Sequence, residues 1–482
     1  MAPKKETCQI SAVIDSIKQV PIDAAYLKKP AHLRTRNERF EHGRAMRVSM
    51  PREAHAEYTV NFQGRHDPID LMINATSGRV EDLLPIRNGR MMASPFAFYR
   101  GSAGLMASDL ASIPNTGYAV QACGDCHLMN FGAFATPERN IIFDINDFDE
   151  TFPAPFEWDV KRLAASFVIA SLHNGHKMND AVAAARRAVE CYRDRLYELA
   201  EMTALAAWYS YLDYEDLIEL TSDVKLKKRR KKVLEKAMSR DASAEFIKLA
   251  HVVEGTPRIK DAPPLIFHPP ISEMPDFEKR MEAATRAYRQ SLAPERRILF
   301  DRYELCDMAM KVVGVGSVGT KCYIALFFSA EEDPLFLQVK EARQSVLEPY
   351  LDSPAFPTNG ERVVFGQRLM QAATDVFLGH LVDMQGNHFY VRQLRDVKVK
   401  PMVEIFSQEN MLGFARNCGW ALARAHARSG DPAILAGYMG KGKPFPEAIS
   451  RFAESYARQN NKDHAALIEA IRDSRLDAFV EE

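Results

Sequence analysis

The stretch that decides the fold is CGDCHLMNFGAFATPERNIIFDINDFDE, residues 123–150. Its first five residues spell C-x-x-C-H, the pattern that attaches a c-type haem. Read from Gly124 onward, the same residues give G-D-x-H-x-x-N, which is followed after a short apolar run by D-F-D. Acidic, histidine and amide side chains in this order can hold a metal ion and phosphate groups. The two interpretations exclude one another, and the rest of the chain decides between them.

The cysteine content argues against haem. The chain has seven cysteines, an odd and scattered set that is typical of reduced thiols rather than of a disulfide framework. They are Cys8, Cys123, Cys126, Cys191, Cys306, Cys322 and Cys418. Covalent haem attachment takes place on the oxidising side of a membrane, and residues 1–21 lack the continuous apolar segment of a signal peptide. A zinc site would need a second close Cys or His pair. We therefore expect a cytoplasmic protein without haem.

Composition and charge are those of an ordinary globular protein. Of the 482 residues, 46% are hydrophobic and 26% are charged, and the net charge is -1. A chain with this net charge has no overall electrostatic attraction for nucleic acid or for an anionic membrane. No run of apolar residues approaches the ~18 that a membrane span needs. The strongest basic cluster is KLKKRRKK, residues 225–232. Because it has no aromatic residue and acidic residues flank it, a solvated helix face is favoured over a polyanion contact.

The polar residues of the opening stretch fit a phosphoryl-transfer site. Such a site must hold phosphates, place Mg²⁺ and orient an acceptor hydroxyl, and Mg²⁺ prefers oxygen ligands. Asp125 and Asn130 stand five residues apart, and Asp147 follows a predicted strand over residues 140–147. We expect Asp125 to orient or deprotonate the acceptor, and Asn130 and Asp147 to ligate metal. Asp149 is expected to ligate a second Mg²⁺ or to cap the following loop.

Two further residues are expected to shape residues 123–130, which we call the Asp125 loop. His127 is a third catalytic candidate beside Asp125 and Asn130; it either bonds the backbone of the loop or lies near the acceptor. Asp159 begins a predicted helix in WDVKRL, where its carboxylate is expected to accept hydrogen bonds from the backbone of the loop.

A glycine-rich stretch predicts the nucleotide site. GVGSVG, residues 314–319, matches G-x-G-x-x-G through Gly314, Gly316 and Gly319. A Rossmann loop with this pattern must open a helix. Here the glycines enter TKCYIALFF, a β-branched and aromatic strand, so we predict a strand–turn–strand structure that we call the glycine flap.

The strand that follows TKCYIALFF ends in QVK, which places Lys340 twenty-four residues after Gly316. A lysine at this place can reach the α- and β-phosphates of a nucleotide and needs a carboxylate partner from a following helix. Glu348 is the first candidate for that partner, with Glu361 and Gln367 behind it. The alternative is a plain glycine-rich hairpin with a surface lysine.

The motif order is that of a protein kinase only after rearrangement. Protein kinases run from glycine loop and lysine to the loop that carries the catalytic Asp, whereas here the Asp125 loop precedes the flap. Moving residues 300–430 ahead of residue 88 restores the order. We therefore predict an α+β, protein-kinase-like two-lobed fold that is circularly permuted, which is tolerable when the old termini lie close together. The expected regions are an N-terminal extension (1–87), a catalytic-loop and helical region (88–295), a β-rich nucleotide-binding region (296–400) and C-terminal helices completing the helical lobe (401–482).

Several stretches together resemble a bacterial family, called domain of unknown function 2252. They include RMMASPFAFYRG, CGDCHLMNFG, DINDFDET, WDVKRLAAS, KVVGVGSVGTKC, FLQVKEA, RVVFGQRLMQAATDVFLG and FYVRQLRDVK. The resemblance covers residues 30–470 approximately, and it implies relatedness without giving a substrate. In that family a small residue such as Ala is common at the position of Cys126, which argues against a ligand role for this cysteine. The form G-D-x-H-x-x-N itself resembles the aminoglycoside and choline kinases.

The expected function is an ATP- and Mg²⁺-dependent phosphotransferase that acts on an unknown small-molecule or protein acceptor. AMP transfer and a nucleotide-binding pseudoenzyme with a regulatory role remain alternatives. A metal hydrolase built on Asp125, His127, Asp144 and Asp147 is a third. Nucleic acid is not an expected partner. Arg90 and Arg100 are candidate phosphate or carboxylate binders, or members of structural ion pairs, and Arg392 is expected to have a buried partner.

Overall fold

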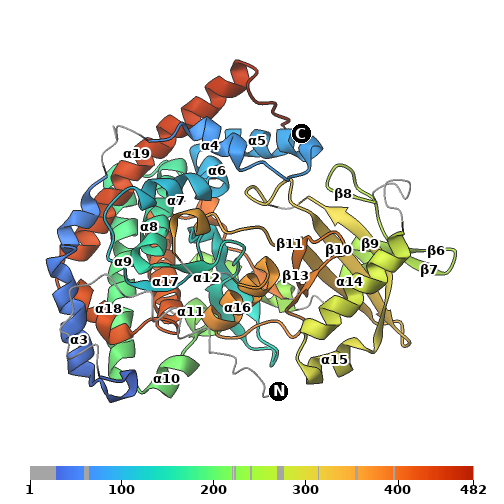
Figure 1. The fold of residues 1–482 in the computed structure, drawn as a ribbon, viewed down its shortest axis with the longest axis horizontal. Helices are drawn as coiled ribbons and strands as arrows, with labels where there is room; N and C mark the ends of the chain where they lie inside the picture. The colour runs from blue at the N-terminus through green and yellow to red at the C-terminus, as the bar shows by residue number, and fades with distance from the viewer. Residues whose placement is uncertain are drawn as a thin grey trace, which may run out of the picture.

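The protein combines a helical part with a β-rich part in one chain (Figure 1). The computed structural model describes residues 29–58, 65–219, 221, 224–238, 242–268, 276–312, 314–352, 356–394 and 397–480. Parts of the expected N-terminal extension, residues 1–28 and 59–64, lie outside the described residues. The predicted α+β class is confirmed, because long helices and a separate antiparallel sheet are both present.

The helices of the described chain are as follows. They are α3 (Arg36–Ala45), α4 (Pro68–Asn74), α5 (Leu84–Met92), α6 (Pro95–Gly101), α7 (Ala103–Ala111), α8 (Phe156–His173), α9 (Met178–Glu201), α10 (Ala204–Tyr209), α11 (Tyr214–Glu219), α12 (Val224–Met238), α13 (Ala242–Leu249), α14 (Phe277–Ser291), α15 (Pro294–Phe300), α16 (Asn359–Met370), α17 (Gln408–His426), α18 (Pro432–Met439) and α19 (Pro444–Arg472). None of them is long and apolar enough to span a membrane.

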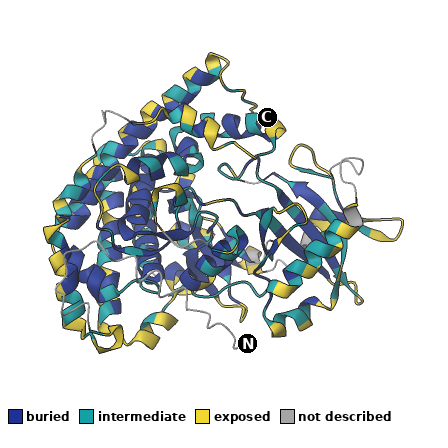
Figure 2. Ribbon diagram, viewed as in Figure 1, coloured by how far each residue is buried: buried dark blue, intermediate teal, exposed yellow. Residues whose placement is uncertain are grey.

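Helix α8 is the centre of the helical part. Nearly all its residues are buried, including the predicted apolar positions Val160, Leu163 and Phe167, so the helix is covered on every side. Helices α9, α17 and α19 pack around it and share one apolar core with it. The C-terminal helices α17 to α19 therefore cover the helices that follow the Asp125 loop, and Figure 2 shows the buried residues gathered at this centre.

The β-rich part is a six-stranded sheet with the order β12-β13-β11-β10-β9-β8. Its strands are β8 (Ile266–Phe267), β9 (Tyr303–Lys311), β10 (Cys322–Ser329), β11 (Pro334–Glu341), β12 (Gly379–Val382) and β13 (His388–Gln393). All neighbours run antiparallel, and β9 and β10 form a hairpin that encloses the glycine flap. The predicted strand–turn–strand structure is therefore confirmed. Helix α14 packs against the β12 side of the sheet.

Smaller strands lie outside this sheet, and β1 and β2 among them hold the Asp125 loop. They are β1 (Ala119–Ala122), β2 (Phe131–Ala135), β3 (Ile141–Ile145), β4 (Phe152–Pro155), β5 (Leu212–Asp213), β6 (Ala250–Val253), β7 (Thr256–Ile259) and β14 (Lys398–Val399). The loop connects β1 to β2, and β3 lies antiparallel to β2 and ends just before Asn146. Both ends of residues 123–150 are thus held by paired strands.

Strand β3 confirms the predicted strand but is more deeply buried than expected. We expected Ile141, Phe143 and Ile145 to form one apolar face, whereas all five residues of β3 are buried. Helices α17 and α11 both pack against the strand. Phe414 of α17 packs on Phe143, and Arg424 of the same helix pairs with Asp144 on the opposite face, so a helix more than two hundred residues away contacts both faces.

The basic run at residues 225–232 lies on helix α12, and most of its side chains are exposed. Lys227 and Lys231 form ion pairs with Glu219 at 2.8 and 2.6 Å. These contacts tie two of the lysines to a neighbouring acidic residue on the protein itself.

Candidate functional site

The Asp125 loop is held by its own backbone. Gly124 has a φ of +83°, and a Cβ at this position would lie 2.2 Å from the carbonyl oxygen of Glu150. Only glycine therefore fits between the loop and the segment after β3. The amides of Cys123 and Gly124 donate to the two carboxylate oxygens of Asp159 at 2.7 and 3.0 Å. The predicted role of Asp159 is confirmed.

A histidine from the C-terminal helices completes this support. His426, the last residue of α17, lies with Nε2 3.1 Å from Asp159 Oδ2 and with Nδ1 2.9 Å from the hydroxyl of Tyr192. All three side chains are buried. The Asp125 loop is consequently fixed by residues from α8, α9 and α17.

Asp125 presents its carboxylate to a cavity. Its Oδ1 accepts hydrogen bonds from Arg162 Nη2 and Nε at 2.7 and 2.9 Å, and 21% of its side chain is exposed. Asn130 donates from Nδ2 to the carbonyl oxygen of Asp125 at 2.7 Å. The arginine and the asparagine thus fix the side chain and the backbone of Asp125 separately.

His127 lies beside Asp125 without a hydrogen bond to it. Its Nε2 is 3.7 Å from Asp125 Oδ2, and its Nδ1 is buried without a hydrogen-bond partner. The contact with the loop's own backbone is made by the amide of His127, which donates to the carbonyl of Asp125 at 2.8 Å. Burial lowers the pKa of the imidazole to about 3, with Arg100 and Arg162 acting in the same direction. The ring is therefore neutral at ordinary pH.

Lys340 meets the D-F-D segment (residues 147–149) across 191 residues of sequence. Its ammonium lies 2.5 Å from Asp149 Oδ2, and only 4% of the lysine side chain is exposed. The hydroxyl of Tyr390 donates to Asp149 Oδ1, and Ser317 of the glycine flap donates to Oδ2 at 3.3 Å. Lys340 is thus buried and paired, which rules out the plain hairpin with a surface lysine.

The two aspartates of the segment differ in charge environment. Burial alone raises the pKa of Asp149, but Lys340 and the hydrogen bonds from Lys340 and Tyr390 lower it to about 2. For Asp147, burial and the neighbouring Asp149 charge raise the pKa above its ordinary value, with Lys340 and Arg392 opposing them. Two carboxylates that repel one another in a cleft form a natural position for a divalent cation.

The expected partner of Lys340, Glu348, is not the residue that it contacts. Glu348 begins a short 3-10 helix, Glu348–Tyr350, and its Oε2 is buried without a hydrogen-bond partner. Glu361 lies in the first turn of α16, and Gln367 donates to Gln371 at 2.9 Å. The chain after β11 turns these side chains elsewhere, and Asp149 takes the position of the carboxylate partner.

Helix α16 contributes an arginine instead of a carboxylate. The buried guanidinium of Arg362 donates to the carbonyl oxygens of Asp149, Thr151 and Arg343 at 2.9, 2.5 and 2.7 Å. It thereby ties the D-F-D segment to the loop after β11. Sequence reasoning missed Arg362 and Tyr390. The register Lys340↔Tyr390 could have been suggested only by a correct pairing of β11 with β13.

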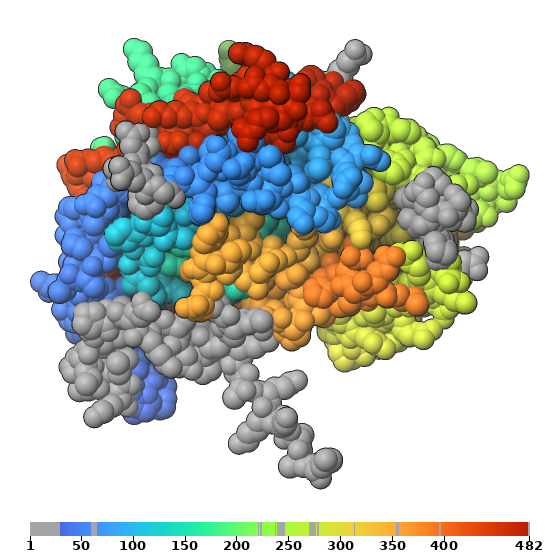
Figure 3. Space-filling view, turned by 45° about the horizontal axis from the view of Figure 1, so that its top comes forward, coloured from blue at the N-terminus to red at the C-terminus, as the bar shows by residue number. Residues whose placement is uncertain are grey.

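The glycine flap lies over the same cleft. Arg79 donates to the carbonyl oxygens of Gly316 and Val318 at 2.8 and 2.6 Å, and Arg90 donates to that of Gly314 at 2.6 Å. Gly319 has a φ of +86°, and its carbonyl accepts from the amide of Val80 at 2.8 Å. The helical segment before the Asp125 loop therefore fixes the flap, and Figure 3 shows this blue segment lying against the gold and orange residues.

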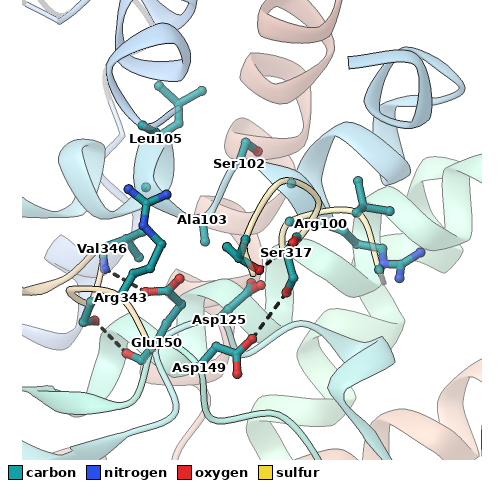
Figure 4. A pocket seen from close by; sticks show the side chains of 18 of the residues that line it. Arg100, Ser102, Ala103, Leu105, Asp125, Asp149, Glu150, Ser317, Arg343 and Val346 are labelled. Carbon is teal, nitrogen blue, oxygen red and sulfur yellow. Dashed lines mark hydrogen bonds between the residues drawn. The ribbon is translucent and has the colours of Figure 1, made fainter. Parts of the chain in front are cut away.

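One cavity of about 470 Å³ connects these parts. Its lining includes the following polar residues: Asp125, His127, Asn130, Asp147, Asp149, Glu150, Ser317, Glu341, Arg79, Arg87, Arg100 and Arg343. Figure 4 shows Asp125, Asp149 and Glu150 close together, with Ser317 bonded to Asp149. Burial raises the pKa of Glu150 to about 7, although its carboxylate accepts from the amide of Val346 at 2.8 Å. Sequence reasoning did not identify Glu150 as part of the site.

Two other candidate metal sets are not supported. Asp144 forms a buried ion pair with Arg424 and accepts from the amide of Ala372 at 2.8 Å, so it is not available to a site with Asp125 and Asp147. Cys123, Cys126 and Asp159 lie together, but both oxygens of Asp159 hold the Asp125 loop. Burial raises the pKa of Cys126 to about 11 and that of Cys123 well above its ordinary value, so the thiols stay protonated.

Fold and site together define an α+β protein whose cleft brings acidic side chains, a buried lysine and a glycine flap together from distant segments. The chain belongs to the family described as "Uncharacterized protein conserved in bacteria (DUF2252)", whose profile matches residues 79–470. The family resemblance expected from the sequence motifs is thereby confirmed. No curated protein and no solved structure matches the chain.

Proposed function

We propose that this protein is an ATP- and Mg²⁺-dependent phosphotransferase with a circularly permuted, protein-kinase-like two-lobed fold. The observation that carries the proposal is the buried Lys340–Asp149 pair, which lies beside the glycine flap and borders the cavity of Asp125. In protein kinases a glycine-rich loop covers the phosphates, a lysine on the third strand reaches them, and an aspartate from a D-F-G turn holds Mg²⁺.

The order of elements supports this comparison. Counted from the flap hairpin, β9 and β10 are the first two strands, Lys340 lies on the third strand β11, and helix α16 follows. Strands β12 and β13 and the long helix α17 come next. If the elements from β9 to α17 are placed ahead of α5, α17 comes before the Asp125 loop. The contact between His426 and Asp159 then joins two motifs that are close together in the rearranged order.

Each polar group has a task in the proposed reaction. Lys340 and the backbone amides of the flap hold nucleotide phosphates. Asp147 and Asn130 offer the hard oxygen ligands that Mg²⁺ prefers, and Asp147 lies close enough to Asp149 for the two charges to repel. Asp149, whose oxygens accept from Lys340, Tyr390 and Ser317, would become a further ligand when a nucleotide phosphate takes over Lys340. Bound Mg²⁺ neutralises phosphate charge during transfer. Asp125, held by Arg162, orients the acceptor hydroxyl and accepts its proton.

AMP transfer on the same scaffold is the alternative reaction, because the groups that hold Mg²⁺ and phosphates do not by themselves set which phosphorus is attacked. A binder without turnover, the pseudoenzyme, remains the outcome if no transfer is found.

Thermal unfolding with ATP, in the presence and absence of Mg²⁺, tests nucleotide binding. Binding to the folded state at one hundred times Kd stabilises it by about 2.7 kcal/mol. We expect this gain for the wild type and its loss in Lys340→Met and Asp147→Asn. Lys161→Met is the matched control, because Lys161 is also buried but stacks on Phe452 in the helical core. A wild type that Mg-ATP does not stabilise would contradict the proposal.

The reaction type follows from the position of the label. Turnover of γ-labelled ATP with transfer or hydrolysis to ADP identifies a phosphotransferase, and transfer of α-label with release of pyrophosphate identifies an AMP transferase. Asp125→Asn should abolish either reaction while leaving the Mg-ATP stabilisation in place. Stabilisation without any turnover identifies the pseudoenzyme.

A further inference from the structure

Four arginines line the main cavity, and the proposed phosphoryl transfer gives them no task. We call Arg79, Arg87, Arg100 and Arg343 the arginine group. They come from the turn after α4, from α5, from α6 and from the loop after β11. Burial and the charges of Arg79 and Arg343 lower the pKa of Arg87 to about 9, so these three guanidinium groups lie close enough to repel one another.

No carboxylate neutralises this charge at close range. Within the part of the chain that the structure describes, no Asp or Glu oxygen lies within 4 Å of a guanidinium nitrogen of the group. The hydrogen bonds that these side chains make go to backbone carbonyls: Arg79 to Gly316 and Val318, Arg87 to Gly101, and Arg343 to Ser77. Carboxylates act on Arg79 and Arg100 only at longer range, and the fully buried Arg87 has other arginines as its charged neighbours. A buried charge without a partner is costly, so the retention of Arg87 calls for a ligand.

Free donors point to the same conclusion. Arg87 is 3% exposed, and its Nε and Nη1 are buried without a hydrogen-bond partner. The Nε of Arg100 is also buried without a partner. Buried polar atoms are nearly always hydrogen-bonded in folded proteins, and guanidinium groups bind carboxylate and phosphate oxygens in pairs. An oxyanion in the cavity would satisfy both the charge and the donors.

The glycine flap contacts both a member of the arginine group and the partner of Lys340. Ser317 of the flap donates to Asp149, the partner of Lys340, whereas the carbonyls of Gly316 and Val318 accept from Arg79. A Cβ on Gly316 would also lie 3.3 Å from the carbonyl oxygen of Arg100. Asp125, Asp147 and Asp149 line the main cavity together with the arginine group, whereas Lys340 is not among the described residues that line it.

We propose that the arginine group is an oxyanion site that binds a phosphate group carried by the acceptor, which makes the acceptor a phosphorylated small molecule. The assignment to the acceptor rests on the proposed phosphotransferase function, whereas the oxyanion site does not. The cavity volume of about 470 Å³ lies in the range of small-ligand sites.

Titration with inorganic phosphate in the absence of nucleotide tests the site itself. Calorimetry is run at constant ionic strength with chloride as the reference anion. We expect phosphate binding by the wild type and at least tenfold weaker binding by Arg343→Gln and Arg87→Met. Arg343 is half-buried, so its variant remains informative if Arg87→Met does not fold. The matched control is Arg47→Gln, because Arg47 also donates to backbone carbonyls but lies away from the cavity.

The oxyanion site would be overturned if the wild type bound phosphate no more tightly than chloride. It would also be overturned if Arg47→Gln lost as much phosphate affinity as Arg343→Gln. Mg-ATP titration of the same proteins then separates acceptor from nucleotide. We expect Arg343→Gln to keep its Mg-ATP affinity within threefold, and Lys340→Met to lose Mg-ATP but keep phosphate. Equal loss of Mg-ATP in both variants would assign the arginines to the nucleotide and overturn the acceptor assignment. Phosphate binding without any Mg-ATP binding by the wild type would support the site and refute the phosphotransferase.

Discussion

The Lys340–Asp149 pair should be one of the strongest electrostatic couplings in the protein. The two side chains are 4% and 24% exposed and lie 2.5 Å apart. Removing one partner of a buried pair costs about 3–5 kcal/mol, because the other charge stays buried and unpaired. Asp149 keeps the hydrogen bond from Tyr390 and some contact with water, so Lys340→Met should lower the free energy of unfolding by about 3 kcal/mol.

A double-mutant cycle isolates the pair from the other effects of each substitution. Combined with Asp149→Asn, Lys340→Met no longer leaves the Asp149 charge unpaired, so the coupling energy should be about 2 kcal/mol. The loss of unfolding free energy caused by Lys340→Met alone should also increase with pH. Without the lysine, Asp147 and Asp149 can relieve their repulsion only by binding a proton, which they do in acid. Urea unfolding followed by circular dichroism at pH 6 and pH 8 provides both values.

The matched control is the pair Arg289–Asp301, which has the same N–O distance of 2.5 Å but side chains 42% and 43% exposed. Water screens such a pair, so its cycle should give no measurable coupling. The reasoning is refuted if Lys340 and Asp149 couple no more strongly than this exposed pair. Distance alone would then describe both contacts, and burial would have no effect.

Three further predictions concern the segment that surrounds the site. Burial raises the pKa of Glu150 from 4.5 to about 7, so the folded state binds more protons than the unfolded state between these values and loses stability as pH rises through them. Glu150→Gln should therefore gain stability over the wild type by about 2 kcal/mol more at pH 8 than at pH 5, and a pH-independent difference in urea unfolding would contradict this. Gly124→Ala should lower the free energy of unfolding by more than about 3 kcal/mol, because its Cβ would overlap a carbonyl oxygen. Gly175→Ala, at a φ of +81° with open space around it, should lower it by only about 1 kcal/mol. Equal thermal shifts in the two variants would refute the steric argument. Arg362→Met should lower the free energy of unfolding by about 3 kcal/mol. In this variant the amides of residues 149–151 should also exchange their hydrogens faster. Unchanged protection of these amides would show that the arginine does not hold this segment.

The parts of the site that sequence reasoning identified depend on local patterns. The spacing of Asp125 and Asn130, the glycine flap between two β-branched strands, and Asp159 at a helix start are each set within about twenty residues. Local turn chemistry and periodicity determine such features. The juxtaposition of Lys340 with the D-F-D segment followed from the order of motifs, and its geometry is now visible.

The features that sequence reasoning missed depend on tertiary packing. The partner of Lys340 was expected within the next thirty residues, yet Asp149 lies 191 residues earlier in the chain. The arginine group draws on four separate segments, and sequence reasoning named only Arg100 among its members. Helix α17 contacts both faces of β3. Each of these contacts requires knowledge of which elements pack together, and neither alternation nor residue spacing contains it.

The most direct test of the proposed cleft uses Mn²⁺ in place of Mg²⁺. Water-proton relaxation rises when Mn²⁺-ATP binds to a protein, and the wild type should produce this enhancement with one site per chain. Asp147→Asn and Lys340→Met should lose it, and Lys161→Met should keep it. An enhancement that is equally large with Mn²⁺ alone, or that survives both cleft substitutions, would contradict a nucleotide held between the D-F-D carboxylates and Lys340.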